Sequence, residues 1–233
     1  MVREYRYSSG LPTLDWEDPM LEARRISGSG IVRSAVRRTA RGFGPLKRLN
    51  FEFKAYLHRE SRVRSTLKRL RARFLGTDHQ VDTYFHVPIG RLKVREGRFE
   101  NALIFYQRTN SPRARRSTIE MILLPRRNSL RAILSQSLGV LAVVDKRREI
   151  YFVGNVKIHL DRVRGLGKFM EVEAITKSGN VRKVRTQARK FQKLFAVSST
   201  DIVPLSYSDL ILKKRTRLAV SKVQGAPRGR PKR

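Results

Sequence analysis

The sequence contains no cysteine, and it is poor in acidic residues. Without cysteine the chain can form neither a disulfide nor a thiolate metal site, which fits a reducing compartment. Only 19 Asp and Glu stand against 52 Lys and Arg among its 233 residues, so the formal net charge is +33. This excess predicts attraction to polyanions such as nucleic acid, anionic lipid, nucleotides or polyphosphate, and it says nothing about the fold.

Long apolar runs are also missing. The longest ones, such as VLAVV at 140–144, are far too short to cross a bilayer as a helix. Residues 1–10, MVREYRYSSG, are polar and lack the apolar segment of a secretory signal. We therefore expect a cytoplasmic protein that does not enter a membrane.

Changes in composition along the chain predict three parts. A basic, flexible extension over 1–47 precedes a folded domain over 48–213, and a basic, disordered tail follows over 214–233. The tail ends in PRGRPKR (227–233), which matches the R-G-R-P core of an AT-hook, a motif that places arginines in the minor groove of AT-rich DNA. So short a match arises easily by chance, so a plain solvated tail is the alternative. Both basic ends favour nonspecific contact with nucleic acid.

Alternating residues indicate a mainly β domain. In LNFEFKAYL (49–57) every second residue is apolar, which is typical of a half-buried strand. Similar stretches, separated by glycines, cover 81–87, 90–96, 102–108, 117–124, 138–152, 155–163 and 168–175. Helical spacing predicts helices over 59–75, 128–138, 180–196 and 206–213. Because strands follow strands, we predict an α+β fold with an antiparallel sheet or barrel.

The polar faces of the predicted strands are charged, and the charges sort by sign. The first and last strands carry the acids Glu52, Asp161, Glu171 and Glu173, while the middle strands carry Lys and Arg. For any one strand, a solvent-facing surface is the ordinary explanation. If the sheet closes into a barrel, however, its first and last strands become neighbours, and the acids gather beside a wall of cations. We therefore expect these faces to line an interior bore.

Such a bore suits a triphosphate. Arg binds phosphate oxygens with two parallel hydrogen bonds, and Lys binds them as a point charge. Grouped carboxylates hold Mg²⁺ or Mn²⁺, which bridges phosphate oxygens and offsets developing charge.

Several strings occur in an order that resembles the CYTH superfamily. NFEFK (50–54) is similar to the family's entry motif E-x-E-x-K, with Glu52 and Lys54 matching. The strings that follow, and that extend the similarity over about 48–213, are DTYFHVPIGRLKVRE, LIFYQR, VVDKRREIY, HLDRVRGLGKFMEVE and LSYSDLIL. The first of them looks most like the class IV adenylate cyclase-like branch. The superfamily comprises triphosphate tunnel metalloenzymes, including class IV adenylate cyclases and thiamine triphosphatases.

The resemblance implies an eight-stranded antiparallel β-barrel, flanked by helices, that binds a triphosphate with Mg²⁺ or Mn²⁺. By position it assigns phosphate binding to Lys54, Lys93, Arg95, Arg108, Arg115, Lys146 and Arg148. It assigns metal binding to Glu52, Asp161, Glu171 and Glu173, and catalysis to Glu52 and Lys54.

The chain departs from the family pattern at two places. Asn50 replaces the first Glu of the entry motif, and it brings a carbonyl ligand without a charge, so metal binding and turnover should weaken. The later Lys is replaced by a run of arginines, of which we take Arg115 as the stand-in. His159 may be read either as a base in the bore or as a hydrogen-bonded bystander, and we favour the bystander.

Two classes of function remain open. The first is an enzyme that acts on ATP, thiamine triphosphate or tripolyphosphate, either as a phosphohydrolase or as a cyclase that forms cAMP from ATP. The second is a noncatalytic tunnel that binds a polyanion or nucleic acid. The sequence allows a monomer or a homodimer.

Overall fold

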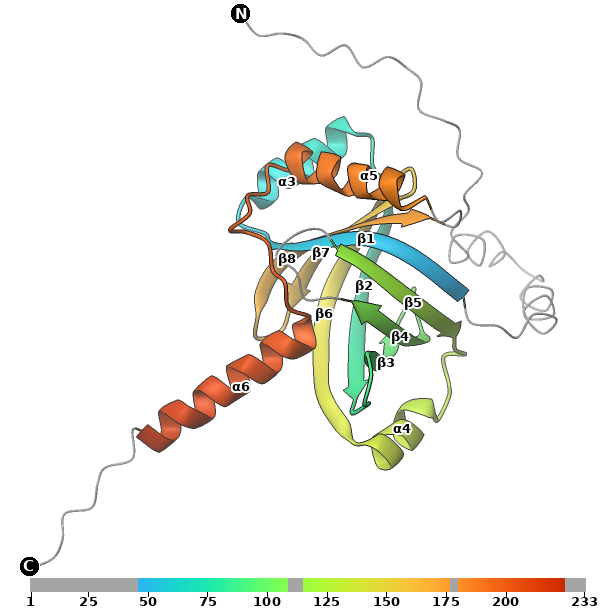
Figure 1. The fold of residues 1–233 in the computed structure, drawn as a ribbon, viewed down its shortest axis with the longest axis vertical. Coiled ribbons are helices and arrows are strands. Elements are labelled where there is room, and N and C mark those ends of the chain that lie inside the picture. The colour runs from blue at the N-terminus through green and yellow to red at the C-terminus, as the bar shows by residue number, and fades with distance from the viewer. Residues whose placement is uncertain (1–45, 109–114, 177–179, 225–233) are drawn as a thin grey trace, which may run out of the picture. The chain divides into compact units, whose positions relative to one another are not determined.

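A computed structural model describes residues 46–108, 115–176 and 180–224 (Figure 1). Eight strands form a closed antiparallel barrel in the order β1-β5-β4-β3-β2-β6-β7-β8. The strands are β1 (Leu46–Tyr56), β2 (Arg73–Phe85), β3 (Arg91–Gly97), β4 (Ala102–Arg108), β5 (Arg115–Leu123), β6 (Val140–Val153), β7 (Val156–Val163) and β8 (Gly167–Thr176). The helices of the described residues are α3 (Glu60–Arg69), α4 (Leu130–Leu138), α5 (Val181–Leu194) and α6 (Tyr207–Gln224). The predicted α+β barrel is confirmed.

The barrel closes where β1 pairs with β8. In this register Glu52 lies opposite Glu173, and Lys54 lies opposite Glu171. The predicted meeting of the first and last strands is therefore confirmed, and it brings charged residues of the two strands side by side.

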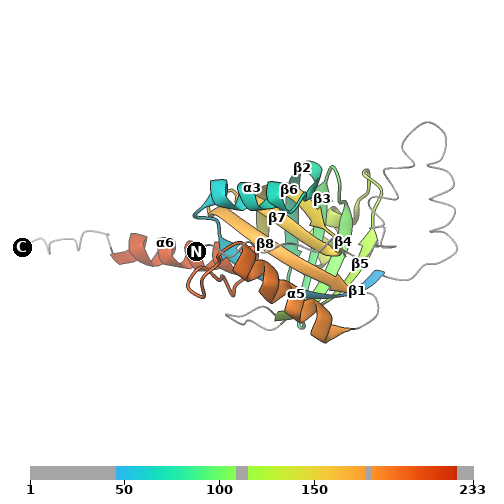
Figure 2. The same cartoon turned by 90° about the horizontal axis from the view of Figure 1, so that it is seen from above.

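The outer face of β1, β7 and β8 is apolar and is covered by α3 and α5 (Figures 1 and 2). Phe53, Ile158 and Val172 are almost completely buried there. They pack in one cluster with residues of the two helices, such as Leu67 and Phe191. Burying each such side chain contributes about 1.5–3 kcal/mol. Since the apolar residues of these strands point outward into this layer, the alternating polar residues point into the barrel.

The helix predicted over 59–75 ends earlier than expected. It stops at Arg69, and Arg71 has a φ of 48°, a left-handed conformation that turns the chain out of the helix. Strand β2 begins at Arg73, well before the predicted start at 81. A register shift between Phe74 and Gly76 interrupts the alternation in this part of β2, which is why the pattern hid the strand.

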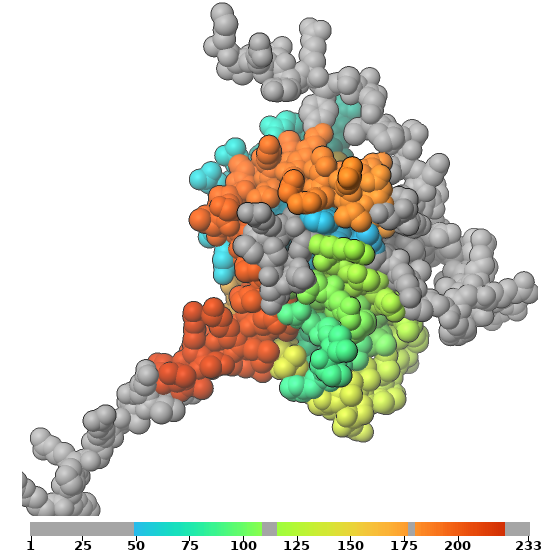
Figure 3. All heavy atoms as spheres, viewed as in Figure 1, coloured from blue at the N-terminus to red at the C-terminus, as the bar shows by residue number. Residues whose placement is uncertain are grey.

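Helix α6 is longer than the predicted 206–213. Its first residue, Tyr207, is buried in a second apolar cluster, distinct from the one under α3 and α5. Leu210 and Ile211 pack against this second cluster. The helix then runs on to Gln224, and its atoms extend away from the barrel in the space-filling view (Figure 3). Leu218 and Val220 on this helix are exposed. The expectation of disorder is therefore wrong for 214–224, while the AT-hook-like segment lies outside the described residues. In the part of the chain that the structure describes, no helix has both the length and the apolar character needed to cross a membrane.

Candidate functional site: a charged bore

The barrel encloses a cavity of about 110 Å³. Among the described residues its lining carries charged side chains of both signs from seven of the eight strands. The cations are Lys54, Lys93, Arg95, Arg108, Lys146, Arg148 and Lys157, and the acids are Glu52, Asp82, Glu100, Glu171 and Glu173. The polar side of 49–57 thus lines an interior, and the predicted bore is present.

One side of the bore is organised by Asp82. Its carboxylate accepts hydrogen bonds from Lys93 Nζ at 2.9 Å, from Lys146 Nζ at 2.7 Å, and from Arg95 Nε at 2.6 Å. Burial opposes ionisation of Asp82, but Arg95, Lys146 and Lys93 together hold its pKa well below the ordinary value. Burial lowers the pKa of Lys146 to about 7, although Asp82 counteracts this. The cations of this side are therefore already paired.

Glu100 completes this side, and a tight turn after β3 places it. Asp78 accepts hydrogen bonds from the backbone N–H groups of Arg98 and Phe99 at 2.7 and 3.1 Å. A Cβ at Gly97 would lie 2.8 Å from Asp78 Oδ2, so only glycine allows this approach. The turn presents Glu100 to Arg95, whose Nη1 donates to it at 2.7 Å. We call Asp82, Lys93, Arg95, Glu100 and Lys146 the paired side.

A second ion-pair group links β6, β7 and β8. Arg148 donates from Nε to Asp161 at 2.7 Å and from Nη2 to both Asp161 and Glu171. The Tyr207 hydroxyl, at the start of α6, donates to Asp161 at 2.7 Å. Asp161 is thus buried and occupied by Arg148 and Tyr207. Its predicted role as a metal ligand stays a prediction.

Lys54 lies between a carboxylate and an aromatic ring. Its Nζ is 3.1 Å from Glu171 Oε1 and 3.6 Å from the ring centroid of Tyr207. Burial lowers the pKa of Lys54 to about 8, opposed by the charge of Glu171. The ammonium therefore carries its charge at neutral pH, in a position facing the bore.

The opposite arc of the barrel, on β1, β4, β5 and β7, holds buried polar atoms that have no hydrogen-bond partner among the described residues. They are Asn50 Oδ1, Arg108 Nε and Nη2, Ser117 Oγ, and both ring nitrogens of His159. Arg108 Nη1 does donate to Glu52 at 2.9 Å. A buried polar group without a partner costs about 1–3 kcal/mol, so this arc is suited to a polar ligand. We call Asn50, Arg108, Ser117 and His159 the open side.

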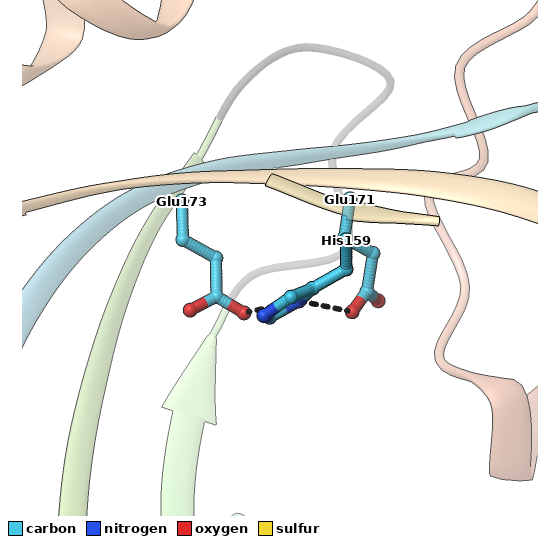
Figure 4. A group of neighbouring side chains, drawn as sticks. All are labelled: His159, Glu171 and Glu173. Carbon is cyan, nitrogen blue, oxygen red and sulfur yellow. Dashed lines mark ion pairs between the residues drawn. The ribbon is translucent and has the colours of Figure 1, made fainter. Parts of the chain in front are cut away.

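His159 lies between two carboxylates of β8 (Figure 4). Its Nδ1 is 3.8 Å from Glu171 Oε2 and 3.7 Å from Glu173 Oε1. One ligand atom from each of the three residues falls within 4.8 Å of the others. Burial, with a contribution from Arg148, lowers the pKa of His159 to about 3, so the imidazole is neutral and can act as a ligand. Burial raises the pKa of Glu173 to about 7, helped by Glu52 and Glu171 and opposed by Lys157.

The structure brings most of the predicted site residues together in the bore, namely Glu52, Lys54, Lys93, Arg95, Arg108, Lys146, Arg148, Glu171 and Glu173. Arg115 pairs with Glu52 in the register of β1 and β5, but its side chain lies outside the described residues. Their individual roles stay predictions.

Sequence reasoning missed Asp82, Glu100 and Tyr207 as members of the site. Asp82 stands in the quoted string DTYFHV, and alternation places it on the same face as Gln80 and Tyr84. That signal could have identified an acid inside the cationic wall. No sequence signal identifies Glu100, because a turn and not a strand carries it into the bore.

Comparison with known proteins adds two findings. The family model of the CYTH domain matches residues 48–207, which is more than half of the chain. A comparison of the sequence with curated proteins finds no match.

Solved structures share the fold at low sequence identity. The PH1012 protein from Pyrococcus horikoshii OT3 is 23% identical, with 69% of this chain and 98% of that chain covered and a TM-score of 0.58. A candidate adenylate cyclase from Vibrio parahaemolyticus is 21% identical, with 70% and 97% covered and the same TM-score of 0.58. A conserved hypothetical protein from Pyrococcus furiosus is 19% identical, with 69% and 99% covered and a TM-score of 0.58. These likenesses concern the fold, whereas the model match identifies the family: this chain belongs to the CYTH domain family.

Proposed function

We propose that this chain is a metal-dependent hydrolase of a triphosphate that lies in the bore. The observation that carries this proposal is the open side, where Arg108, Asn50 and Ser117 present buried polar atoms that have no hydrogen-bond partner in the part of the chain that the structure describes. These atoms face the same cavity as the carboxylates of Glu171 and Glu173. Donors for an anion and ligands for a cation therefore line one enclosed space, as hydrolysis of a phosphoanhydride requires.

The cations of the bore would bind the phosphates. Two nitrogens of the Arg108 guanidinium, Nε and Nη2, make no hydrogen bond within the described residues, while the third, Nη1, donates to Glu52. A planar guanidinium with two free donors suits a phosphate oxygen pair. Lys54 adds a point charge from the adjoining strand, and Lys146 and Lys93 extend the positive wall from the paired side. In this proposal Glu52 orients Arg108 and Lys54 neutralises the reacting phosphate.

The residues present also fit a divalent cation. Carboxylate oxygens are the ligands that Mg²⁺ and Mn²⁺ prefer, and Glu171, Glu173 and His159 offer three ligand atoms with the orphaned imidazole among them. The imidazole nitrogen makes this set less selective against softer ions. When bound, such an ion supplies charge neutralisation and polarisation of phosphoryl oxygens. Asn50, on the neighbouring strand, contributes a carbonyl oxygen where the family motif has a carboxylate.

Hydrolysis is favoured over cyclisation because it asks less of the substrate. Water attacks the terminal phosphorus, the bond to the bridging oxygen breaks, and the charged bore binds phosphates whatever group they carry. Cyclisation requires a ribose 3′-hydroxyl held in line with the α-phosphorus of ATP. Because the Vibrio protein is a candidate adenylate cyclase, cAMP formation is the second enzymatic outcome.

A noncatalytic polyanion binder is the other class of function, and Asn50 favours it. An uncharged residue in the entry motif reduces the negative charge available to a metal, while the cations of the bore are retained. In that case the bore binds tripolyphosphate without turnover.

The test is an assay of phosphate release and of cAMP with ATP, thiamine triphosphate and tripolyphosphate, each with Mg²⁺ and with Mn²⁺. We expect phosphate release from at least one compound. Glu173→Gln should abolish this release while the circular dichroism spectrum is unchanged, because it removes one ligand charge and keeps the shape; Glu171→Gln should act similarly. Binding without release by the wild-type protein would support the binder, and full activity of both variants would refute the role of these carboxylates.

Asn50→Glu offers a gain-of-function test. It restores the motif carboxylate beside the three candidate ligands, so we expect metal-dependent phosphate release to rise by about tenfold, the effect of roughly 1.4 kcal/mol. Asn50→Gln lengthens the side chain by the same atom without the charge and is the matched control. Equal rates in the two variants would exclude a metal-related role for position 50.

A further inference from the structure

A groove on the outside of the barrel holds a second concentration of positive charge. It lies between α3 and the strands β6, β7 and β8, and its volume is about 350 Å³. The wall of β6 and β7 separates it from the bore, because alternate residues of these strands face opposite ways. On β6, Lys146 and Arg148 line the bore, whereas Arg147 lines the groove.

Three cations cross the floor of this groove in a row. Arg147 on β6 lies directly opposite Arg162 on β7, and Arg162 lies directly opposite Lys168 on β8. All three are exposed. Cβ atoms of directly opposed residues are about 4.5–5.5 Å apart, and like charges at that distance destabilise a sheet. Folding stability therefore does not account for this row.

The acids of the groove are already used. Glu60 binds Arg64 and Lys168, each at 2.7 Å, and Glu149 binds Arg64 at 2.8 Å. The guanidinium groups of Arg147 and Arg162 make neither a hydrogen bond nor an ion pair with any described residue. Two adjacent guanidinium groups thus remain available to an anion from solution.

An exposed aromatic ring stands on the same outer surface. Phe74 on β2 is 52% exposed and pairs in register with Tyr151 on β6. The two rings are 4.8 Å apart between centroids. Tyr151, Glu149 and Arg147 alternate along β6, so they share the outer face. The Tyr151 hydroxyl donates a hydrogen bond to Glu149 at 2.7 Å, and Phe74 is the more exposed ring of the pair.

We propose that this groove binds single-stranded nucleic acid. Arg147 and Arg162 contact successive backbone phosphates, and Phe74 stacks on a base. A cationic groove with an exposed aromatic ring is the arrangement that binds single strands without sequence preference. Free phosphate or polyphosphate would make no use of Phe74, and the bases of a duplex are not available for stacking. The surface is independent of the bore and of the basic ends of the chain.

The experiment is fluorescence anisotropy of the full chain with a labelled single-stranded oligonucleotide, once as DNA and once as RNA, at several salt concentrations. Each phosphate contact to a single strand contributes about 0.7 to the slope of log K against log salt. R147A/R162A should therefore lower this slope by about 1.4 and weaken binding at 0.1 M salt by about 25-fold. F74A should weaken it by about fivefold or more and leave the slope unchanged.

The matched control is R182A/R189A, which removes two exposed arginines from α5. We expect it to retain most of the affinity. R147A/R162A should keep the wild-type melting temperature or raise it, because it removes like-charge repulsion, and it should leave phosphate release from a triphosphate unchanged. Wild-type failure to bind either strand, or equal losses in R147A/R162A and R182A/R189A, would overturn the proposal. So would an F74A variant that binds the single strand as tightly as wild type, since polyphosphate-like recognition would then suffice.

Discussion

On the paired side of the bore, one carboxylate binds three cations; on the open side, four residues carry buried polar atoms that have no hydrogen-bond partner among the described residues. Both sides are equally enclosed, since Asp82 and His159 are each 1% exposed. The difference teaches that a charged interior is not by itself a ligand site. On the paired side each cation already has a carboxylate partner and the group contributes to the structure, whereas the polar atoms of the open side gain a partner when a ligand binds.

The largest expected effect tests the paired side. Asp82→Ala leaves Lys93, Arg95 and Lys146 without their shared partner, and removing one member of a buried ion pair costs about 3–5 kcal/mol. Urea unfolding followed by circular dichroism should show this loss. Asp145→Ala is the control, because Asp145 pairs with His79 and Arg164 at the surface, where a pair is worth about 0–1 kcal/mol. Similar losses in both variants would show that the paired side has no special structural role.

The next effect tests the open side. Arg108→Gln removes the two free donors, so tripolyphosphate affinity measured by calorimetry should fall by about 1.5–3 kcal/mol, the value of a hydrogen bond to a charged group. Arg91→Gln serves as the control, because Arg91 binds Asp209 and does not line the bore. If Arg91→Gln weakened binding as much as Arg108→Gln, the effect would be one of net charge and the assignment of the open side would be wrong.

The pH dependence of tripolyphosphate affinity tests whether a cation of the paired side also contributes to binding. Burial lowers the pKa of Lys146 from 10.5 to about 7, so its positive charge is present below pH 7 and is lost above it. Tripolyphosphate affinity should therefore decrease as the pH rises through 7, by at most about tenfold per pH unit. Calorimetry at several pH values measures this, and Lys146→Met provides the baseline for the ionisation of the ligand itself. The same pH dependence in Lys146→Met would exclude Lys146 as the titrating group.

The smallest expected effect concerns one hydroxyl group, that of Ser117, whose removal should affect ligand binding and folding stability differently. Ser117 Oγ is buried and has no hydrogen-bond partner within the described ranges, so Ser117→Ala should leave the free energy of unfolding unchanged or raise it by up to about 1 kcal/mol. It should also weaken tripolyphosphate binding by a similar amount. Ser208→Ala, which removes a hydroxyl paired with Ser206 at 2.7 Å, should instead lower stability. A destabilised Ser117→Ala would mean that this hydroxyl has a structural partner.

Strand alternation predicted an antiparallel sheet or barrel and most of the residues that line it. Lys93 and Arg95, or Glu171 and Glu173, stand at every second position, and a period of two reports which face a residue occupies. The sorting of charge along the strands favoured closure between the first and last strands, and the resemblance to the CYTH superfamily implied the closed eight-stranded barrel. Both predictions are confirmed by the structure.

The pairing inside the bore could not be predicted, because it depends on contacts between strands that are distant in sequence. Asp82 meets Lys146 through the pairing of β2 with β6, and Asp161 meets Tyr207 through the packing of α6. Alternation predicts which face of the sheet a side chain occupies, but it does not predict which side chain of another strand it contacts. For the same reason the two ring nitrogens of His159, which the sequence suggested were hydrogen-bonded, have no hydrogen-bond partner among the described residues, although Nδ1 lies near Glu171 and Glu173.

The most direct test of the difference between the two sides is a crystal structure with tripolyphosphate and Mn²⁺, in which anomalous scattering locates the metal. Phosphate oxygens should lie within hydrogen-bond distance of Arg108 and Ser117, with the metal at Glu171 and Glu173 and the Asp82 ion pairs intact. Phosphate bound by Lys93 and Arg95 in place of Asp82, with Arg108 uncontacted, would contradict the account.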